Sequence, residues 1–251
     1  MIMHSFLLIG QSNMGGRGIA SEVEPIENER LFVLRNGRWR DMYVPVNADR
    51  NTSGTNLAES FADRYAREHN VDVGLIPCAD GGSSLDMWQK GGVLYDHACF
   101  MAGLAMRSST IAGVLWHQGE SDCADALYPL YEEKLHVILN NFRDDLGLHD
   151  VPFLLGGLGD YLKDCPLDQK YKNYIHVNES LKRVAAARER TAFVSAEGLG
   201  SNPDLLHFSA PALREFGLRY YDEFIKLEDK SKVFPDKSPA EFAIRTGIEK
   251  L

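Results

Sequence analysis

The segment LLIGQSNMGG, residues 7–16, joins a short apolar run to a glycine and then to a polar turn with one serine, Ser12. An apolar run of this length that stops at a glycine is typical of a strand buried on both faces of a parallel sheet. In α/β proteins the turns that follow such strands lie at the carboxyl edge of the sheet and build the site. The segment therefore predicts an α/β fold with Ser12 at its functional edge.

The rest of the chain alternates apolar runs with stretches of helical spacing. Besides residues 6–10, we expect strands over 71–78, 111–119, 151–158 and 191–196. We expect helices over 56–69, 95–109, 127–146, 171–190 and 211–228. Strands that alternate with helices form parallel sheets, and right-handed crossovers cover both faces of the sheet with helices. The prediction is a three-layer α/β/α sandwich around a central five-stranded parallel sheet.

The segment LFVLRNGRWRDM, residues 31–42, has a different pattern. Asn36 and Gly37 both tolerate a positive φ, which favours a tight turn between two short strands. This small hairpin is not counted in the five-stranded sheet. A length of 251 residues is common for one α/β domain with loops. We expect a single domain over 1–251, with 229–251 as a C-terminal extension to which the sequence assigns no role.

The chain has a formal net charge of −9 and no run rich in lysine or arginine. Acidic chains of this kind bind nucleic acids and anionic membranes poorly, so we expect neither as a partner. No apolar stretch approaches the ~20 residues that span a bilayer. The first ten residues lack the basic start and cleavage site of a secretory signal, and we expect a cytoplasmic protein. The sequence carries no signal for the oligomeric state.

The cysteines are too widely spaced for a zinc site. The chain contains Cys78, Cys99, Cys123 and Cys165, and no two of them form a C-x-x-C pair. Structural zinc sites use closely spaced pairs, so none is expected. In the absence of an export signal we expect four free thiols.

Polar residues follow four of the predicted strands. These segments are 11–13, 79–84, 117–122 and 204–207. The carboxyl ends of parallel strands meet at one edge of the sheet, so we expect the four segments to line one concave polar site.

Ser12 is a candidate nucleophile. A serine hydroxyl is weak at neutral pH and needs a neighbouring base. His207 is the candidate base, with Asp204 as the residue that orients it, because an aspartate and a histidine three residues apart on a turn can face the same way. Two simpler interpretations remain open at this point. Ser12 can be a helix cap, and Asp204 and Ser209 can cap a helix while His207 lies on the surface.

Two further residues are candidates for an oxyanion hole. A Gly-Gly pair lets the backbone approach a substrate oxygen closely, and the side-chain amide of Gln118 can donate to a developing negative charge. One such donor is typically worth ~3 kcal/mol. We expect the N–H groups of Ser12 and Gly82 to act with Gln118, although Gly81 can take the place of Gly82. The simpler interpretations are a plain turn and a surface loop.

Other polar residues in these segments have less certain roles. Gln11, Asn13 and Glu120 are candidates for binding substrate hydroxyls. Glu120 and Asp122 can bind substrate hydroxyls, support the loop or be solvated. Arg17 is expected either to pair with a carboxylate or to lie at the rim of the site.

Together, the motifs GQSNM, GGSSLDMW, HQGESD and DLLH resemble the SGNH hydrolase superfamily in their order and position. The resemblance is to its carbohydrate-esterase branch, the sialate O-acetylesterase-like and acetylxylan-esterase-like proteins, and runs from about residue 6 to about residue 228. It implies a flavodoxin-like α/β/α fold. The first motif lacks the second glycine of the α/β-hydrolase pattern G-x-S-x-G, so that fold is not expected.

The resemblance also implies roles for individual residues. Ser12 becomes the nucleophile, His207 the base and Asp204 its support. The N–H groups of Ser12 and Gly82 and the amide of Gln118 become the oxyanion hole. The expected function is a serine esterase that needs no metal or cofactor and removes acetyl groups from acetylated sialic acid, xylan fragments or similar small carbohydrates through an acetyl-enzyme.

Two other functions remain open from the residues alone. One is a metal-dependent hydrolase in which His117, Glu120, Asp122, Asp204 and His207 converge on a divalent ion. This spacing matches no standard metal-ligand motif. The other is a non-catalytic α/β module that binds a sugar or a nucleotide, although neither phosphate-binding glycine motif follows the first strand.

Overall fold

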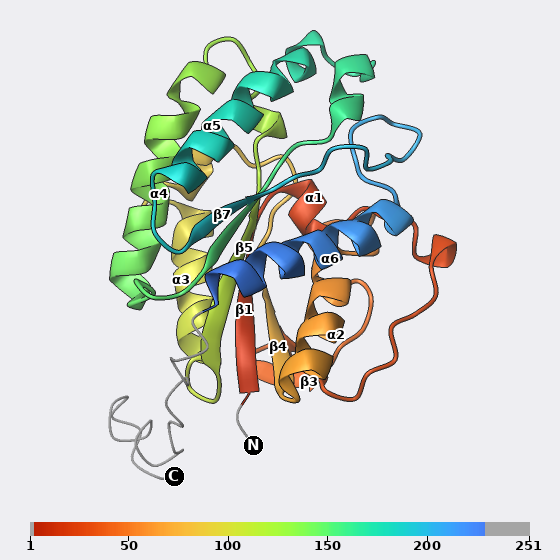
Figure 1. Ribbon diagram of the computed structural model, residues 1–251, viewed down its shortest axis with the longest axis vertical. Coiled ribbons are helices and arrows are strands. Elements are labelled where there is room, and N and C mark those ends of the chain that lie inside the picture. The colour runs from red at the N-terminus through yellow and green to blue at the C-terminus, as the bar shows by residue number, and fades with distance from the viewer. Residues whose placement is uncertain (1–2, 229–251) are drawn as a thin grey trace.

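The computed structural model describes residues 3–228, so the predicted extension at 229–251 lies outside the described residues. Among these residues the sheet has seven strands in the order β3-β2-β4-β1-β5-β6-β7 (Figure 1). The strands are β1 (Met3–Gly10), β2 (Leu31–Arg35), β3 (Arg38–Asp41), β4 (Asp72–Pro77), β5 (Thr110–His117), β6 (Phe153–Gly156) and β7 (Thr191–Val194). All neighbours are parallel except β2 and β3. The predicted α/β/α fold is confirmed, but the predicted count of five strands is wrong.

The two additional strands are those of the predicted hairpin, which joins the edge of the sheet. Its turn lies at Asn36 and Gly37, which have φ values of 49° and 73°. β2 pairs in parallel with β4, with Val33 opposite Leu75, and both side chains are buried. The apolar side chains of β2 therefore extend the buried sheet. The local turn signal predicts the hairpin but carries no information about this long-range pairing.

The described residues form six α-helices. They are α1 (Ser12–Gly15), α2 (Leu57–His69), α3 (Val93–Ala105), α4 (Tyr131–Leu146), α5 (Tyr174–Ala186) and α6 (Ala210–Leu227). The five longer helices confirm the predicted ones, with ends displaced by no more than four residues. α2 begins with a capping box, in which Asn56 accepts the Ala58 N–H at 2.6 Å and donates its own N–H to Glu59 at 2.8 Å.

Helices cover both faces of the sheet. α2 and α6 lie on one face, and α3, α4 and α5 lie on the other (Figure 1). β1 shows how the sequence produces this arrangement, because successive side chains of a strand point to opposite faces. Phe6 and Leu8 pack with α2 and α6, whereas Leu7 and Ile9 pack toward α3 and α4. All four side chains are fully buried, which explains the uninterrupted apolar run.

The sheet order places β1 between β4 and β5. The turns that follow these three strands therefore begin side by side at the carboxyl edge of the sheet. They are the segments 11–16, 78–84 and 118–122. The fourth polar segment, 204–207, precedes α6 and reaches the same edge.

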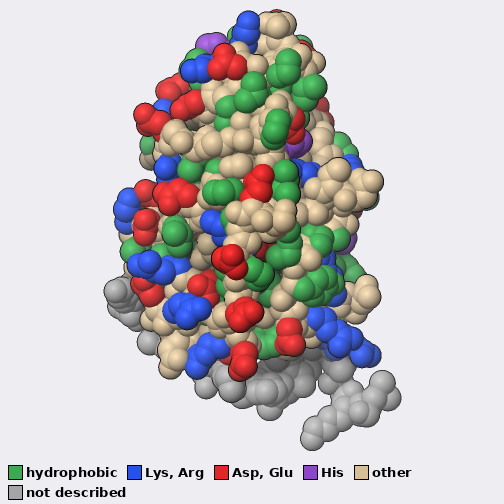
Figure 2. Space-filling model, turned by 90° about the vertical axis from the view of Figure 1, so that its right-hand side faces the viewer, with side chains coloured by type: hydrophobic (Ala, Val, Ile, Leu, Met, Phe, Trp, Pro, Cys, Tyr) green, Lys and Arg blue, Asp and Glu red, His purple; other side chains and the backbone are tan. Residues whose placement is uncertain are grey.

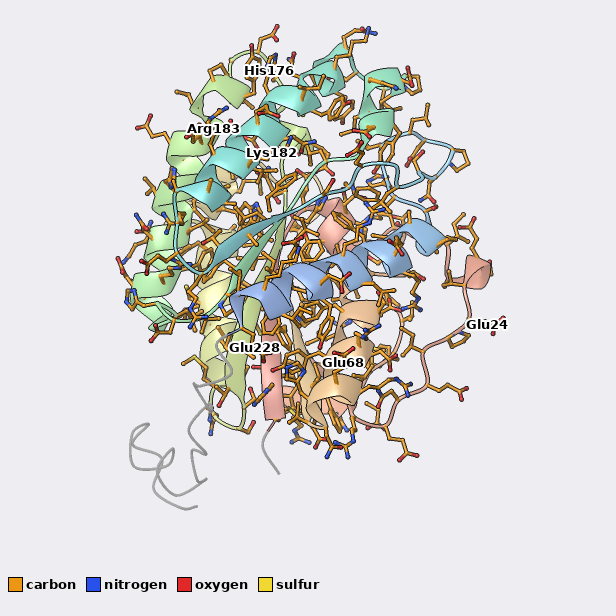
Figure 3. All side chains as sticks on the ribbon, viewed as in Figure 1. Glu24, Glu68, His176, Lys182, Arg183 and Glu228 are labelled. Atoms are coloured by element: carbon orange, nitrogen blue, oxygen red, sulfur yellow. The ribbon has the colours of Figure 1, made fainter. Side chains whose placement is uncertain are left out.

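The face drawn in Figure 2 is mixed in charge and also carries hydrophobic side chains. Figure 2 shows acidic and basic side chains interspersed over the displayed face. His176, Lys182 and Arg183 are labelled along α5 in Figure 3, and Arg183 Nε pairs with Glu132 Oε2 of α4 at 2.6 Å. Exposed pairs of this kind contribute little to stability. No helix within residues 3–228 is long and apolar enough to span a membrane.

Candidate active site

Ser12, His207 and Asp204 form one hydrogen-bonded chain. The Ser12 Oγ is 3.0 Å from His207 Nε2, and His207 Nδ1 is 2.7 Å from Asp204 Oδ2. Ser12 is the first residue of α1, whereas His207 and Asp204 lie on the turn between β7 and α6. The fold thus joins side chains 195 positions apart. A hydroxyl beside a histidine that is held by a carboxylate is the arrangement that activates a serine nucleophile.

The turn before Ser12 is set by a close approach of two strands. Gly10 has a φ of 134°, and a Cβ atom there would lie 2.0 Å from the carbonyl oxygen of His117. Only glycine allows the end of β1 to pass so near to β5. The N-cap of α1 is Gln11, and no side chain caps this helix. The Ser12 hydroxyl is therefore not a helix cap, and its hydrogen bond is with His207.

The turn that carries the histidine is fixed by the same carboxylate. Asp204 Oδ1 accepts the N–H groups of Leu206 at 2.9 Å and of His207 at 3.0 Å, and Leu205 takes a left-handed φ of 49°. Burial alone would raise the pKa of Asp204, but these hydrogen bonds and the contact with the imidazole hold the pKa below its ordinary value. Asp204 is therefore a charged acceptor that orients the ring through Nδ1.

Asn13 connects the turn that carries Ser12 to the turn that carries His207. Its Nδ2 donates to Glu120 Oε1 at 2.5 Å and to the Leu206 carbonyl oxygen at 3.2 Å. Its Oδ1 accepts the Phe208 N–H at 3.1 Å. Leu206 and Phe208 flank His207, so Asn13 holds the backbone on both sides of this histidine. The side chain is 1% exposed.

Gln11 and Glu120 also make internal contacts. Gln11 Oε1 accepts the N–H groups of Gly119 at 3.3 Å and of Ser121 at 3.2 Å. Glu120 accepts from Asn13, and Gln11 and Glu120 are both buried. The substrate-binding role of Gln11, Asn13 and Glu120 stays a prediction, because the polar contacts of these side chains are made within the protein. In this structure they position the loops.

The backbone of the Gly-Gly turn distinguishes the two candidate donors. The Gly81 N–H donates to Asp49 Oδ2 at 2.8 Å and is occupied. Within residues 3–228 no hydrogen bond uses the N–H groups of Gly82 and Ser12. Gly82 is exposed and has a φ of 80°, a conformation that favours glycine. Gly82, and not Gly81, therefore has an N–H group free to bind a substrate oxygen.

The Gln118 amide is held from three sides. Its Nε2 lies 2.5 Å from Asp122 Oδ2, 3.1 Å from the Ser83 carbonyl oxygen and 3.3 Å from Gln11 Oε1. One hydrogen is fixed by the short bond to Asp122. The second is shared between the Ser83 carbonyl oxygen and Gln11 Oε1, so both hydrogens of this buried amide have partners within the protein. Asp122 also accepts the Leu85 N–H at 3.0 Å, and burial raises its pKa.

The sequence matches a known protein family. A family model described as "Carbohydrate esterase, sialic acid-specific acetylesterase" matches residues 2–226. The chain belongs to this family. It is therefore a carboxylic ester hydrolase of the carbohydrate-esterase class, and the resemblance read from the four motifs is confirmed.

Individual relatives agree with this family. The probable carbohydrate esterase At4g34215 of Arabidopsis thaliana is 27% identical over 242 residues, covering 85% of this chain and 86% of its own. The solved structure of that protein aligns with a TM-score of 0.79 over 89% of this chain and 98% of its own, at 24% identity. XAC1771, a carbohydrate acetylesterase from Xanthomonas citri, aligns with a TM-score of 0.62 at 18% identity, over 88% of this chain and 55% of its own. Below 25% identity, these alignments support the fold alone.

In this carbohydrate esterase, further residues at the site lie outside the segments that the sequence pointed to. Asn47 and Asp49 lie between β3 and α2 and bind the backbone of Ala79 and Gly81. Arg17 pairs with Asp49 at 2.6 Å, which realises one of its two predicted roles. The segment 42–56 has neither a motif nor a periodicity, so no pattern in the sequence points to it.

The side chains of the metal-dependent alternative do not converge in this esterase. Within residues 3–228 no three His, Cys, Asp or Glu side chains are placed to hold a metal ion. His117 Nε2 binds the Gly157 carbonyl oxygen at 3.1 Å, and its Nδ1 is 3.9 Å from Glu120. Burial lowers the pKa of His117, so it is a neutral ring in the core. His207 faces Ser12 instead.

Proposed function

We propose that this protein is a serine esterase that removes O-acetyl groups from small carbohydrates through an acetyl-enzyme intermediate. The observation that carries the proposal is the continuous relay from Ser12 Oγ to His207 at 3.0 Å and from His207 to Asp204 at 2.7 Å. The family membership supplies the class of reaction, ester hydrolysis on carbohydrates.

In the first half of the reaction, Ser12 Oγ attacks the acetyl carbonyl carbon while His207 Nε2 takes the hydroxyl proton. The resulting imidazolium is stabilised by Asp204 at Nδ1. The bond from the acetyl carbon to the sugar oxygen then breaks. The sugar oxygen takes the proton from His207 Nε2 and leaves as a free hydroxyl, and the acetyl group stays on Ser12 as an ester.

The charge on the carbonyl oxygen needs fixed donors during this step. The free N–H groups of Ser12 and Gly82 supply two, and the Gln118 amide supplies a third when the substrate oxygen replaces Ser83 or Gln11 as its acceptor. Each donor in such a hole is worth about 3–4 kcal/mol in the transition state. Asp122 keeps the Gln118 amide in place through its 2.5 Å bond.

In the second half, water replaces the sugar. His207 takes a proton from the water as its oxygen attacks the acetyl carbon, and the same donors hold the second oxyanion. Collapse breaks the bond to Ser12 Oγ, which takes the proton back from His207, and acetic acid leaves and gives its proton to the solvent.

The experiment that tests this proposal compares the wild type with Ser12→Ala on p-nitrophenyl acetate, butyrate and octanoate in the presence of EDTA. We expect acetate hydrolysis that withstands the chelator, falls steeply with longer acyl chains and is lost in Ser12→Ala. Acetate release from 9-O-acetylated sialic acid and from acetylated xylo-oligosaccharides then identifies the carbohydrate. Hydrolysis by Ser12→Ala at the wild-type rate would overturn the proposal.

A further inference from the structure

We propose that Asp49, held by Arg17, is a positioning residue for the oxyanion hole. It fixes the peptide that precedes Gly82, so that the Gly82 N–H points to the reacting oxygen. This inference rests on the proposed function, because it assigns Asp49 a part in the same reaction. Asp49 reaches the site from the segment between β3 and α2, outside all four sequence motifs.

The backbone after β4 is satisfied by side chains instead of by a neighbouring strand. Asn47 binds both polar groups of Ala79, accepting its N–H at 3.1 Å and donating to its carbonyl oxygen at 3.0 Å. Asp49 accepts the Gly81 N–H at 2.8 Å, and Arg50 donates to the Gly81 carbonyl oxygen at 3.0 Å. The segment 47–50 therefore holds this backbone up to, but not including, the Gly82 N–H.

The Asp49 carboxylate is itself fixed from several sides. Arg17 approaches it in a bidentate manner, with distances of 2.6 Å and 3.1 Å. Asn47 and Ser53 each donate to Oδ1 at 3.0 Å. The side chains of Arg17 and Asp49 are 6% and 5% exposed. Burial would raise the pKa of Asp49, but these donors and the guanidinium charge hold it below its ordinary value.

The pair also lies directly beside the nucleophile. A Cβ atom on Gly81 would be 2.7 Å from Arg17 Nη2, 3.0 Å from Asp49 Oδ2 and 3.7 Å from the Cβ of Ser12. Gly81 is therefore clamped between the ion pair and the turn that carries Ser12. A shift of the carboxylate moves the peptide that carries the oxyanion donor relative to Ser12 Oγ.

All the atoms that contact Asp49 are donors, which makes the charge necessary. Asparagine keeps the shape of the side chain but replaces one oxygen with an NH₂ group. That group must face either Arg17 and Gly81 or Arg17, Asn47 and Ser53. The contacts with Arg17, Gly81 and Asn47 each place a donor against a donor, whereas the Ser53 hydroxyl can accept instead. Asp49→Asn therefore perturbs the turn without opening a cavity.

The test is the steady-state kinetics of Asp49→Asn on p-nitrophenyl acetate. Displacing a donor by a fraction of an ångström affects the transition state more than the bound ester, so we expect kcat to fall by about tenfold to hundredfold while KM stays within about twofold. Inactivation by paraoxon, whose phosphoryl oxygen occupies the same hole when Ser12 displaces p-nitrophenolate, slows in parallel. Asp63→Asn, an aspartate on α2 paired with exposed Arg67, is the matched control and keeps both rates.

Arg17→Lys serves as a second variant, because it keeps the charge but cannot make both contacts with the carboxylate. We expect an intermediate fall in kcat, and this variant decides the question if Asp49→Asn does not fold. A folded Asp49→Asn protein, or failing that Arg17→Lys, with kcat within about twofold of the wild type overturns the inference. Such a result leaves the proposed function intact as long as Ser12→Ala is inactive. Activity in Ser12→Ala overturns both.

Discussion

The Ser12 hydroxyl oxygen lies 3.0 Å from Nε2 of His207, although the two residues are 195 positions apart in the chain. Ser12 is placed by the central strand β1, and His207 is placed by the turn that leads into α6. Asn13, the neighbour of Ser12, binds the backbone on both sides of His207. The distance between Ser12 and His207 therefore depends on two adjacent residues of one short turn, Ser12 and Asn13.

The first prediction concerns Asp204, the carboxylate that contacts His207. In Asp204→Asn, the remaining side-chain oxygen accepts the N–H groups of Leu206 and His207. The new NH₂ group therefore faces His207 Nδ1. That nitrogen must then accept, which moves the ring proton to Nε2 and points it at Ser12. Loss of the correct tautomer lowers kcat by about 10³- to 10⁴-fold with KM little changed. The measurement is steady-state kinetics on p-nitrophenyl acetate.

Asp164→Asn is the control for this variant, because Asp164 is an exposed aspartate in the loop between β6 and α5. It keeps the wild-type kcat. A fall in kcat of less than about tenfold in Asp204→Asn would show that this carboxylate does not set the tautomer.

Much of the fold could be predicted because its signals are local. The runs that form β1, β4 and β5 are buried on both faces, and such strands carry their signal within a few residues. The edge strands β2 and β3 could be predicted only as a hairpin. Whether a hairpin joins a sheet depends on partners far away in the sequence, here Val33 opposite Leu75. Spacing within 31–42 carries no such information.

The candidate site could also be predicted only where its signals are local. Ser12, Asp204 and His207 belong to short motifs at strand ends, so their residue types and positions indicated a relay. The contacts of Asp49 could not be predicted, because they depend on how the long segment between β3 and α2 folds back over Gly81. The burial of the polar side chains at the site could not be predicted either. Polar Gln11 belongs to a motif and suggested substrate contact, but its oxygen binds the backbone of the next loop.

The second prediction concerns Asn13. Asn13→Ala removes the donor to Glu120 and to the Leu206 carbonyl oxygen, and the acceptor of the Phe208 N–H. Polar groups left buried without partners cost about 1–3 kcal/mol, so we expect the free energy of unfolding to fall by this amount. The His207 turn is also released, and kcat falls by about tenfold to hundredfold. Chemical denaturation and kinetics measure the two effects.

Asn51→Ala, at an exposed position between β3 and α2, controls for the loss of an amide side chain and changes neither quantity. If Asn13→Ala loses stability but keeps kcat, then Asn13 supports the fold without positioning the base.

The third prediction separates backbone strain from loss of the oxyanion donor. Gly82 and Gly91 have φ values of 80° and 82°, and a Cβ atom on either would meet nothing within 4 Å. Alanine at either position is therefore strained without a clash, and each substitution costs about 1–2 kcal/mol of stability. Relief of that strain turns the peptide and displaces its N–H. We expect kcat to fall at least about tenfold in Gly82→Ala alone.

Thermal unfolding measures the stabilities of these two variants, and steady-state kinetics on p-nitrophenyl acetate measures their kcat values. Equal kcat values in Gly82→Ala and Gly91→Ala would remove Gly82 from the proposed oxyanion hole.

The last prediction is a dependence of stability on pH that arises from His117. Burial lowers the pKa of this ring, which donates to the Gly157 carbonyl oxygen and faces the buried Glu120 at 3.9 Å. An unfolded histidine titrates near 6.5, so below about pH 6.5 the unfolded chain binds a proton that the folded chain does not. The free energy of unfolding therefore falls as the pH drops, by up to about 1.4 kcal/mol per pH unit from this group. Burial also lowers the pKa of His4 and His136, so the wild-type slope contains their contributions as well.

His117→Gln isolates the contribution of the one ring. Glutamine retains a donor for the Gly157 carbonyl oxygen but does not titrate, so its unfolding free energy falls less steeply between pH 7 and 5 than that of the wild type. The measurement is urea denaturation at several pH values, with the slopes compared as differences so that His4 and His136 cancel. His149→Gln, a substitution at an exposed histidine paired loosely with Asp144 at 3.7 Å, retains the wild-type slope. A wild-type slope in His117→Gln as well would mean that His117 accepts a proton in the folded state, which its burial and its distance from Glu120 argue against.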